Sequence, residues 1–350
     1  MQTASIVFLS TLAAFYYVVL RWGFTQLPGE KWQILAALPK QKEADGQWLG
    51  TNLTAYGLVT ACAYAASIAL TFVLLGALSL PLLHTVIAAA AILAAVIPAS
   101  SLVARIVEKK AHTFTVGGAS FVGVILAPWV LAAVNAFAPG EIDLPIVPTL
   151  AAFAIAYAFG EGTGRLACIS FGCCYGKPLR ACAPWVQRLF RHKHFVFVGH
   201  TKKIAYAGKL HGEKVVPIQA ITCVLYVGAG LVGTLLFLTA HYAAALLLTM
   251  AVTQVWRIVS ETLRADYRGG KEISVYQVLA LLSLLYATAI VWLVPALALP
   301  APDILLGFAA LWQPWAILFV QLLWLITFVY AGRSMVTGAR LSLYVCEDRI

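Results

Sequence analysis

Charged residues are scarce in this chain. Only 11% of its 350 residues are Asp, Glu, Lys or Arg, whereas 62% are hydrophobic. Soluble domains carry about 25% charged residues, so this composition excludes a chain that folds wholly in water. Short alternating strands, which a transmembrane barrel would require, are also lacking, and so are repeats and low-complexity segments. The composition therefore predicts an all-α, polytopic transmembrane helical bundle.

Apolar runs of roughly 20 residues, long enough to cross a hydrocarbon core about 30 Å thick, recur along the chain. The first run has neither a basic segment before it nor a small-residue cleavage site, so we expect a retained span and not a cleaved signal peptide. The longest segment outside the runs, residues 173–216, is predicted to be a small basic head domain. The nine predicted spans are residues 4–21, 55–78, 84–106, 115–138, 148–172, 217–239, 242–263, 273–297 and 312–332.

Lysine and arginine are missing from one of the two sets of loops that these spans define. The N-terminal tail, residues 79–83, 139–146 and 298–310, and the turn after Thr239 contain only Glu141, Asp143 and Asp303 as charged residues. The other side receives the head domain and the basic C-terminal tail. Because basic residues mark cytoplasmic loops, this pattern predicts a cytoplasmic head and C-terminus and an outside N-terminus. The net charge of +10 is then explained without nucleic acid as a partner.

Two arginines, Arg165 and Arg257, lie inside predicted spans. An arginine at the centre of a membrane helix costs about 2.5–3.5 kcal/mol on insertion scales, so it usually has a partner and a task. Each has a glutamate four residues away on the same helical face, Glu161 and Glu261, so ion pairing is one interpretation. Two guanidinium groups in a lipid-accessible cavity would also suit a phosphate, which each can bind at two points. The two interpretations are compatible.

Cysteine and histidine supply the other candidate groups. The adjacent pair Cys173-Cys174 follows Cys168 closely, but adjacent cysteines lack zinc-site spacing and would form a strained disulfide. Two interpretations of these cysteines are open. They are either small, semi-buried residues at a glycine-bounded turn, or thiols whose ionisation is favoured by nearby arginines. No metal or cofactor is predicted. His112, on the basic side, is a candidate proton carrier. The head histidines are predicted to face lipid headgroups: His192, His194, His200 and His211.

Six short motifs occur in a fixed order between residues 54 and 289. They are Tyr56-Gly57-Leu58, Gly117-Gly118 with Phe121-Val122-Gly123, Gly164-Arg165-Leu166 closing at Gly176, Pro217-x-Gln219, Arg257-x-x-x-Glu261-x-x-Arg264, and Gln277. None is specific alone, but their order and spacing over about two-thirds of the chain resemble the prolipoprotein diacylglyceryl transferase family. The chain is identified as a divergent member of that family, whose enzymes attach lipid to bacterial lipoprotein precursors.

The resemblance implies an enzyme of the bacterial inner membrane whose partners are phosphatidylglycerol and a lipoprotein precursor or small acceptor. A cysteine thiol attacks the diacylglyceryl carbon, and glycerol phosphate leaves. Such a displacement needs a cation for the leaving phosphate and a base for the thiol. The expected catalytic residues are Arg165, Arg257, His112 and Glu261. The expected substrate contacts are Tyr56, Gly117, Gly118, Cys168, Cys173, Cys174, Gly176, Gln219 and Arg264.

The resemblance also divides the chain. Residues 54–172 and 217–297 are expected to form a transferase-like membrane core, with the head between them. Residues 1–53 add an N-terminal span and an amphipathic loop, and residues 298–350 add a C-terminal span and a basic tail. The family's catalytic side faces away from the cytoplasm, whereas the charge pattern here places that side inward. One extra N-terminal span would cause such an inversion, and it would keep the cysteines in a reducing compartment.

Several family residues are replaced. Val116 stands in place of the histidine of the His-Gly-Gly motif, and Val216 in place of the histidine before Pro-x-Gln. Two signature asparagines become Cys168 and Phe171, and a glutamate becomes Cys173. The base is therefore open, with His112 as first candidate and Glu261 as second. A lipid-binding or lipid-moving protein without catalysis is the main alternative; a transporter with broken helices is another, although no inverted repeat is visible.

Overall fold

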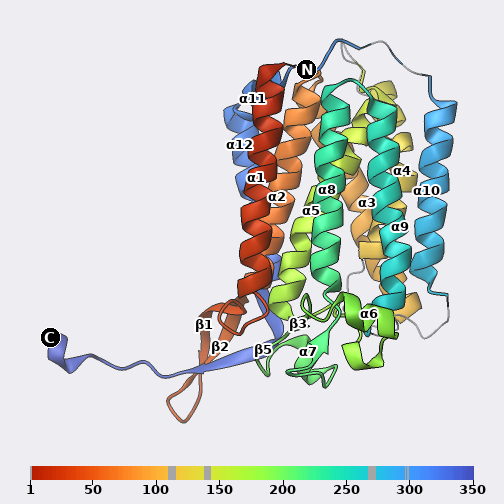
Figure 1. Cartoon of the computed structure of the whole chain (residues 1–350). Helices are drawn as coiled ribbons and strands as arrows, with labels where there is room; N and C mark the ends of the chain where they lie inside the picture. The colour runs from red at the N-terminus through yellow and green to blue at the C-terminus, as the bar shows by residue number, and fades with distance from the viewer. Residues whose placement is uncertain (1, 109–115, 138–142, 267–272, 296, 298) are drawn as a thin grey trace.

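A bundle of long apolar helices dominates the structure (Figure 1). The computed structural model describes residues 2–108, 116–137, 143–266, 273–295, 297 and 299–350. Within these ranges, nine helices are long and apolar enough to span a membrane. The predicted polytopic helical bundle is therefore confirmed, and the helix bounds agree with the predicted spans to within a few residues. The nine are α1 (Thr3–Gln26), α2 (Ala55–Gly76), α3 (Leu82–Glu108), α4 (Val116–Phe137), α5 (Ile146–Phe171), α8 (Ile218–Leu238), α9 (Tyr242–Leu263), α10 (Val275–Leu293) and α12 (Pro314–Gly332).

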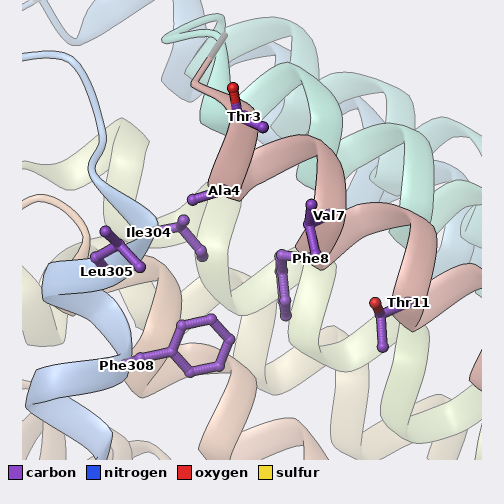
Figure 2. Close-up of a pocket in the computed structure, with 8 residues that line it drawn as sticks. All are labelled: Thr3, Ala4, Val7, Phe8, Thr11, Ile304, Leu305 and Phe308. Atoms are coloured by element: carbon purple, nitrogen blue, oxygen red, sulfur yellow. The ribbon is translucent and has the colours of Figure 1, made fainter.

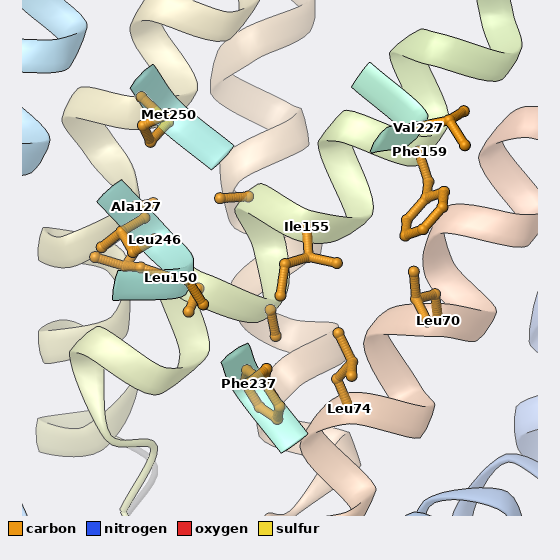
Figure 3. Close-up of a cluster of buried hydrophobic side chains, with 14 of the residues drawn as sticks. Leu70, Leu74, Ala127, Leu150, Ile155, Phe159, Val227, Phe237, Leu246 and Met250 are labelled. Carbon is orange, nitrogen blue, oxygen red and sulfur yellow. The ribbon is translucent and has the colours of Figure 1, made fainter. Parts of the chain in front are cut away.

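Helix α5 lies at the centre of the bundle and packs against α2, α8 and α9. It is rich in buried alanine and glycine, and such small residues allow membrane helices to approach closely. Gly230 of α8, for example, makes room for the ring of Phe159, because a Cβ there would lie 2.7 Å from the ring. Figure 3 shows this apolar core, to which α2 contributes Leu70 and Leu74 and α9 contributes Leu246 and Met250. The core holds the centre of α5 in a fixed position.

The segment predicted to be an amphipathic loop contains a β-hairpin. Strands β1 (Ile34–Lys42) and β2 (Trp48–Thr54) pair antiparallel, and β5 (Arg333–Leu341) from the C-terminal tail pairs with β2. The hairpin turns at Gly46, whose φ of 82° suits glycine. The β2–β5 pairing joins residues nearly 300 positions apart, for example Leu49 and Arg340, so local sequence patterns do not predict it. The sheet order is β1-β2-β5.

The N- and C-terminal additions meet at the start of α2. A Cβ on Gly57 would lie 2.0 Å from the Cα of Gly332, so the backbones of α2 and α12 approach too closely for a side chain at Gly57. Thr54 donates a hydrogen bond to the carbonyl oxygen of Gly332 (2.9 Å). The two flanking segments are thus attached directly to the core.

The predicted loop of residues 298–310 contains a short helix, α11 (Ile304–Leu311), whose N-terminus is capped by Asp303. Gly307 of α11 packs on the backbone of Val73, which explains why this short apolar segment lies against α2. An apolar pocket between α1 and α11 is lined by Thr3, Ala4, Val7, Phe8, Thr11, Ile304, Leu305 and Phe308 (Figure 2). The pocket lies at the opposite end of the bundle from the β1–β2 hairpin (Figure 1).

Residues 173–216 form a small folded unit at the end of the bundle that also carries the sheet (Figure 1). Its elements are η1 (Leu179–Ala181), α6 (Pro184–Leu189), β3 (Phe195–Val196), α7 (Lys203–Tyr206) and β4 (Lys214–Val215), and η2 (Glu347–Arg349) lies in the C-terminal tail. Lys202 is buried and donates hydrogen bonds to the carbonyl oxygens of Leu27 (3.1 Å) and Ser170 (2.6 Å). It therefore ties this unit to the ends of α1 and α5. Burial lowers the pKa of Lys202 to about 8, although Glu30 opposes the shift.

Candidate active site

One face of α5 carries the polar residues at the centre of the bundle. Tyr157, Glu161, Arg165 and Cys168 follow one another at intervals of four, four and three residues. This spacing places them on the same side of the helix. The side chain of Glu161 is only 6% exposed, so its charge requires partners.

Arg165 and Arg257 bind the same carboxylate. Arg165 pairs with Oε1 of Glu161, and Nη2 of Arg257 lies 2.8 Å from Oε2. The hydroxyl group of Tyr157 donates to Glu161 and accepts from Arg257. The structure therefore brings the two arginines together, close enough to share one anion. Arg257 thus has a carboxylate partner on another helix, while Glu261 lies 3.9 Å from Arg264.

The charges and unused donors of this cluster favour a further anion. Two guanidinium groups and one carboxylate leave a formal charge of +1. Among the described residues, the Nε atoms of Arg165 and Arg257 and the Oε1 atom of Gln219 are buried without a hydrogen-bond partner. Buried polar atoms are nearly always hydrogen bonded, so these two unused donors on adjacent cations could each take a hydrogen bond from a ligand or from water. A phosphodiester, with its single negative charge, would neutralise the cluster.

Gly117 and Gly118 open space at the start of α4. A Cβ on Gly117 would lie 2.5 Å from Cδ1 of Tyr276 and 3.2 Å from Nη1 of Arg257. Gly117 therefore allows Arg257 and the Tyr276 ring to occupy their positions. A Cβ on Gly118 would instead meet Val103 of α3 at 2.8 Å, so this glycine serves helix packing.

The end of α5 gathers three thiols. Gly172 has a φ of +71°, and the N–H of Cys173 donates to the carbonyl oxygen of Cys168 (3.0 Å), as in a Schellman motif. This turn places Cys173 beside Cys168. Cys174 also has a left-handed φ, 54°, and the three Sγ atoms lie within 4.8 Å of one another. Hydrogen bonds from the Cys168 and Cys173 thiols lower the pKa of Cys174, the charges of Arg264 and Arg165 act in the same direction, and burial opposes the shift. The same contacts and burial raise the pKa of Cys173.

The segment after the thiols is fixed from both sides. Gly176 forms a β-bridge with Arg264, and a Cβ there would lie 2.3 Å from the carbonyl oxygen of Val216. Gln219 donates to the carbonyl oxygen of Cys173 (2.8 Å). Arg264, whose side chain is 5% exposed, makes a two-point contact with Asp266 at 2.8 and 2.7 Å. In this structure, Gly176, Gln219 and Arg264 therefore position the loop that carries the cysteines.

The remaining predicted residues lie at the edges of this site. The ring of Tyr56 packs edge-on against Phe171 (5.7 Å), and Tyr56 interacts electrostatically with the three thiols. Val116 is exposed at the first turn of α4. His112 lies outside the described residues.

Sequence reasoning did not single out two partners, Tyr157 and Asp266. Tyr157 precedes Glu161 by one helical turn, so spacing could have revealed it. Asp266 follows Arg264 by only two residues, but nothing in the sequence marks that contact.

Fold and site together define a polytopic membrane protein with a buried centre, in which two arginines share one carboxylate beside a thiol cluster. A family model described as prolipoprotein diacylglyceryl transferase matches residues 47–293. The match covers more than half of the chain, from β2 to α10, and leaves out α1, β1, α11, α12 and β5. The chain therefore belongs to the prolipoprotein diacylglyceryl transferase family. It is a multi-pass membrane protein of a transferase family that acts in lipoprotein biosynthesis. Comparisons with curated proteins and with solved structures gave no match.

Proposed function

We propose that this protein transfers a diacylglyceryl group from phosphatidylglycerol, or a closely similar anionic phospholipid, to a thiol and releases glycerol phosphate. The observation that carries the proposal is the pairing of Arg165 and Arg257 with one carboxylate, each with a buried and unused Nε donor. Family membership supports the reaction class. The membrane would be the bacterial inner membrane, where such lipids and lipoprotein precursors meet.

The two guanidinium groups would hold the donor phosphate between them. Glu161 keeps them together, because two adjacent cations would otherwise repel one another. As the bond between the glyceryl carbon and the phosphate oxygen breaks, the phosphate gains a second negative charge. Positioned cations in a site with little water stabilise such developing charge strongly. Arg165 and Arg257 would therefore act on the leaving group.

The base for the acceptor thiol is a separate matter. Glu161 is paired with two arginines, so it is a poor proton acceptor. Val116, in the family's histidine position, carries no titratable group. Glu261 stays a proposal for this role: it lies 3.9 Å from Arg264, and Arg264 interacts electrostatically with Cys174. His112 stays a proposal as well.

The test is consumption of labelled phosphatidylglycerol by the purified protein in liposomes, with a thiol peptide as acceptor. We expect release of glycerol phosphate by the unaltered chain. Arg165→Lys and Arg257→Lys should each lower kcat by at least about 100-fold, the scale of losing one transition-state donor, because an ammonium lacks the planar two-point contact. Arg180→Lys is the matched control, since the Arg180 side chain is 72% exposed. Equal activity in all variants would refute the proposal.

A non-catalytic lipid-binding protein is the second candidate, and the observation that favours it is Val116. This second candidate predicts that phosphatidylglycerol binds in a manner that depends on Arg165 and Arg257, and that no product forms. The same liposome assay, run beside a lipid-binding measurement, separates the two candidates.

We further propose that the site faces the cytoplasm. The head, the sheet and the basic C-terminal tail lie at one end, while α11 and the acidic loop residue Asp303 belong to the opposite end (Figure 1). Lys203→Cys and Ala301→Cys, placed singly in a chain without its other cysteines, test this in intact cells. A membrane-impermeant thiol reagent should label only the second. Labelling of the first would show the opposite orientation.

A further inference from the structure

The three thiols at the end of α5 are the strongest unassigned feature of the molecule. The Sγ atoms of Cys168, Cys173 and Cys174 lie within 4.8 Å of one another. In a tetrahedral zinc site with Zn–S bonds of about 2.3 Å, the sulfur atoms are about 3.8 Å apart. Closing the cluster around an ion would thus require side-chain shifts of about 1 Å or less. Cys173 and Cys174 are partly exposed, so an ion can reach them.

The backbone holds these thiols in place before any ion binds. The Schellman turn fixes Cys173 beside Cys168. Glycine is required at position 172, because a Cβ on Gly172 would lie 2.9 Å from the Cβ of Lys202. Gln219 binds the carbonyl oxygen of Cys173. Cys174 has a left-handed φ, which is rare for a residue with a side chain, and its Sγ lies within 4.8 Å of the other two. Binding would cost little reorganisation.

We propose that Cys168, Cys173 and Cys174 form a zinc site whose fourth position takes the acceptor thiol. This inference rests on the proposed transferase function. Sequence spacing predicts no metal site, because Cys168 joins the pair only through the turn of the chain. Thiolates select zinc among the abundant divalent ions, and three protein ligands with one open position are typical of catalytic zinc.

Charge and position fit this role. Three thiolates and one Zn²⁺ carry a net charge of −1 and lie near the cations Arg165 and Arg264, which also pair with Glu161 and Asp266. Cys168 follows Arg165 by three residues, which is about 4.5 Å along the helix axis at 1.5 Å per residue. The zinc-bound acceptor would therefore lie next to the phosphate-binding arginines. The site also replaces the missing histidine, since a thiol that coordinates zinc is deprotonated outright.

The transfer then balances as follows. The acceptor thiol loses its proton to water when its sulfur binds zinc. That sulfur attacks the glyceryl carbon next to the phosphate, and a carbon–sulfur bond forms. The carbon–oxygen bond to the phosphate breaks, and glycerol phosphate leaves with the electron pair, held by Arg165 and Arg257. No oxidant or reductant is needed.

Metal content of the purified, reduced full-length protein tests the site without reference to activity. We expect one zinc per chain, removed by a chelator and restored by Zn²⁺, and thiolate-to-metal absorption bands when Co²⁺ replaces it. Cys168→Ser, Cys173→Ser and Cys174→Ser should each weaken zinc affinity by more than the about 10–100-fold that loss of an outer partner costs. Cys182→Ser is the control, because Cys182 is also partly exposed but lies outside the cluster.

The outcomes separate this inference from the proposed function. Absence of zinc, or equal zinc in all four variants, overturns the site even if phosphatidylglycerol is consumed. If zinc binds but the lipid is not consumed, the zinc site stands and the proposed transferase activity is refuted. If zinc binds but a cysteine-containing peptide leaves the Co²⁺ spectrum unchanged, the acceptor does not occupy the fourth position. Thermal unfolding of each serine variant in the presence of chelator distinguishes loss of the metal from loss of the fold.

Discussion

Replacement of Glu161 by glutamine tests whether one carboxylate holds both arginines. Glutamine keeps the shape of the side chain but removes the charge that Arg165 and Arg257 share. Glu161 is 6% exposed and Arg257 9%, so solvent does little to screen the remaining positive charges. Removing one partner of a buried ion pair costs about 3–5 kcal/mol. We expect a loss of that size in the free energy of unfolding.

Thermal or denaturant unfolding in a neutral detergent measures this loss. Glu213→Gln is the matched control, because Glu213 pairs with the exposed Arg180 and should contribute at most about 1 kcal/mol. Added phosphatidylglycerol should stabilise Glu161→Gln more than the unaltered chain, because the site then carries a formal charge of +2. Phosphatidylcholine should not do so. Equal stability of the two glutamine variants, or no selective effect of the anionic lipid, would refute the shared-carboxylate account.

Two further substitutions test other parts of the account. Gly117→Ala should lower transferase activity at least about 10-fold, because the added methyl group displaces Tyr276 and Arg257. Gly228→Ala is the control, since a Cβ there meets nothing within 4 Å and activity should not change. Equal rates of the two variants would contradict the prediction. Lys202→Met should lower stability by about 1–3 kcal/mol, because the buried carbonyl groups of Leu27 and Ser170 lose their donor, whereas an unchanged unfolding transition would show that this lysine is not a structural tie.

The helical bundle follows from local information. A run of about 20 apolar residues can satisfy its backbone hydrogen bonds in lipid only as a helix, so nine runs predict nine spans. The sheet cannot be predicted from local information, because β2 and β5 are separated by almost the whole chain and no short sequence pattern indicates that they pair. Nothing in the sequence near Gly57 or Gly332 indicates that these two glycines pack against one another.

The sequence singles out the two arginines and Glu161 of the candidate site, but it misses Tyr157 and predicts the geometry only in part. The interval from Glu161 to Arg165 predicts their contact, whereas the contact from Arg257 to Glu161 joins α9 to α5 and depends on the fold. Adjacent cysteines alone give no metal spacing. The glycine before them does carry a signal, since a left-handed residue after a helix folds the chain back over its last turn and so over Cys168.

The central claim is that one lipid phosphate lies between Arg165 and Arg257. Solid-state NMR can measure ³¹P–¹⁵N dipolar coupling between bound phosphatidylglycerol and ¹⁵N-labelled arginine side chains in a phosphorus-free detergent. The account predicts that the phosphorus couples to guanidinium nitrogens, and that Arg165→Lys and Arg257→Lys each remove part of this coupling. A coupling that neither substitution changes would place the phosphate elsewhere and contradict the account.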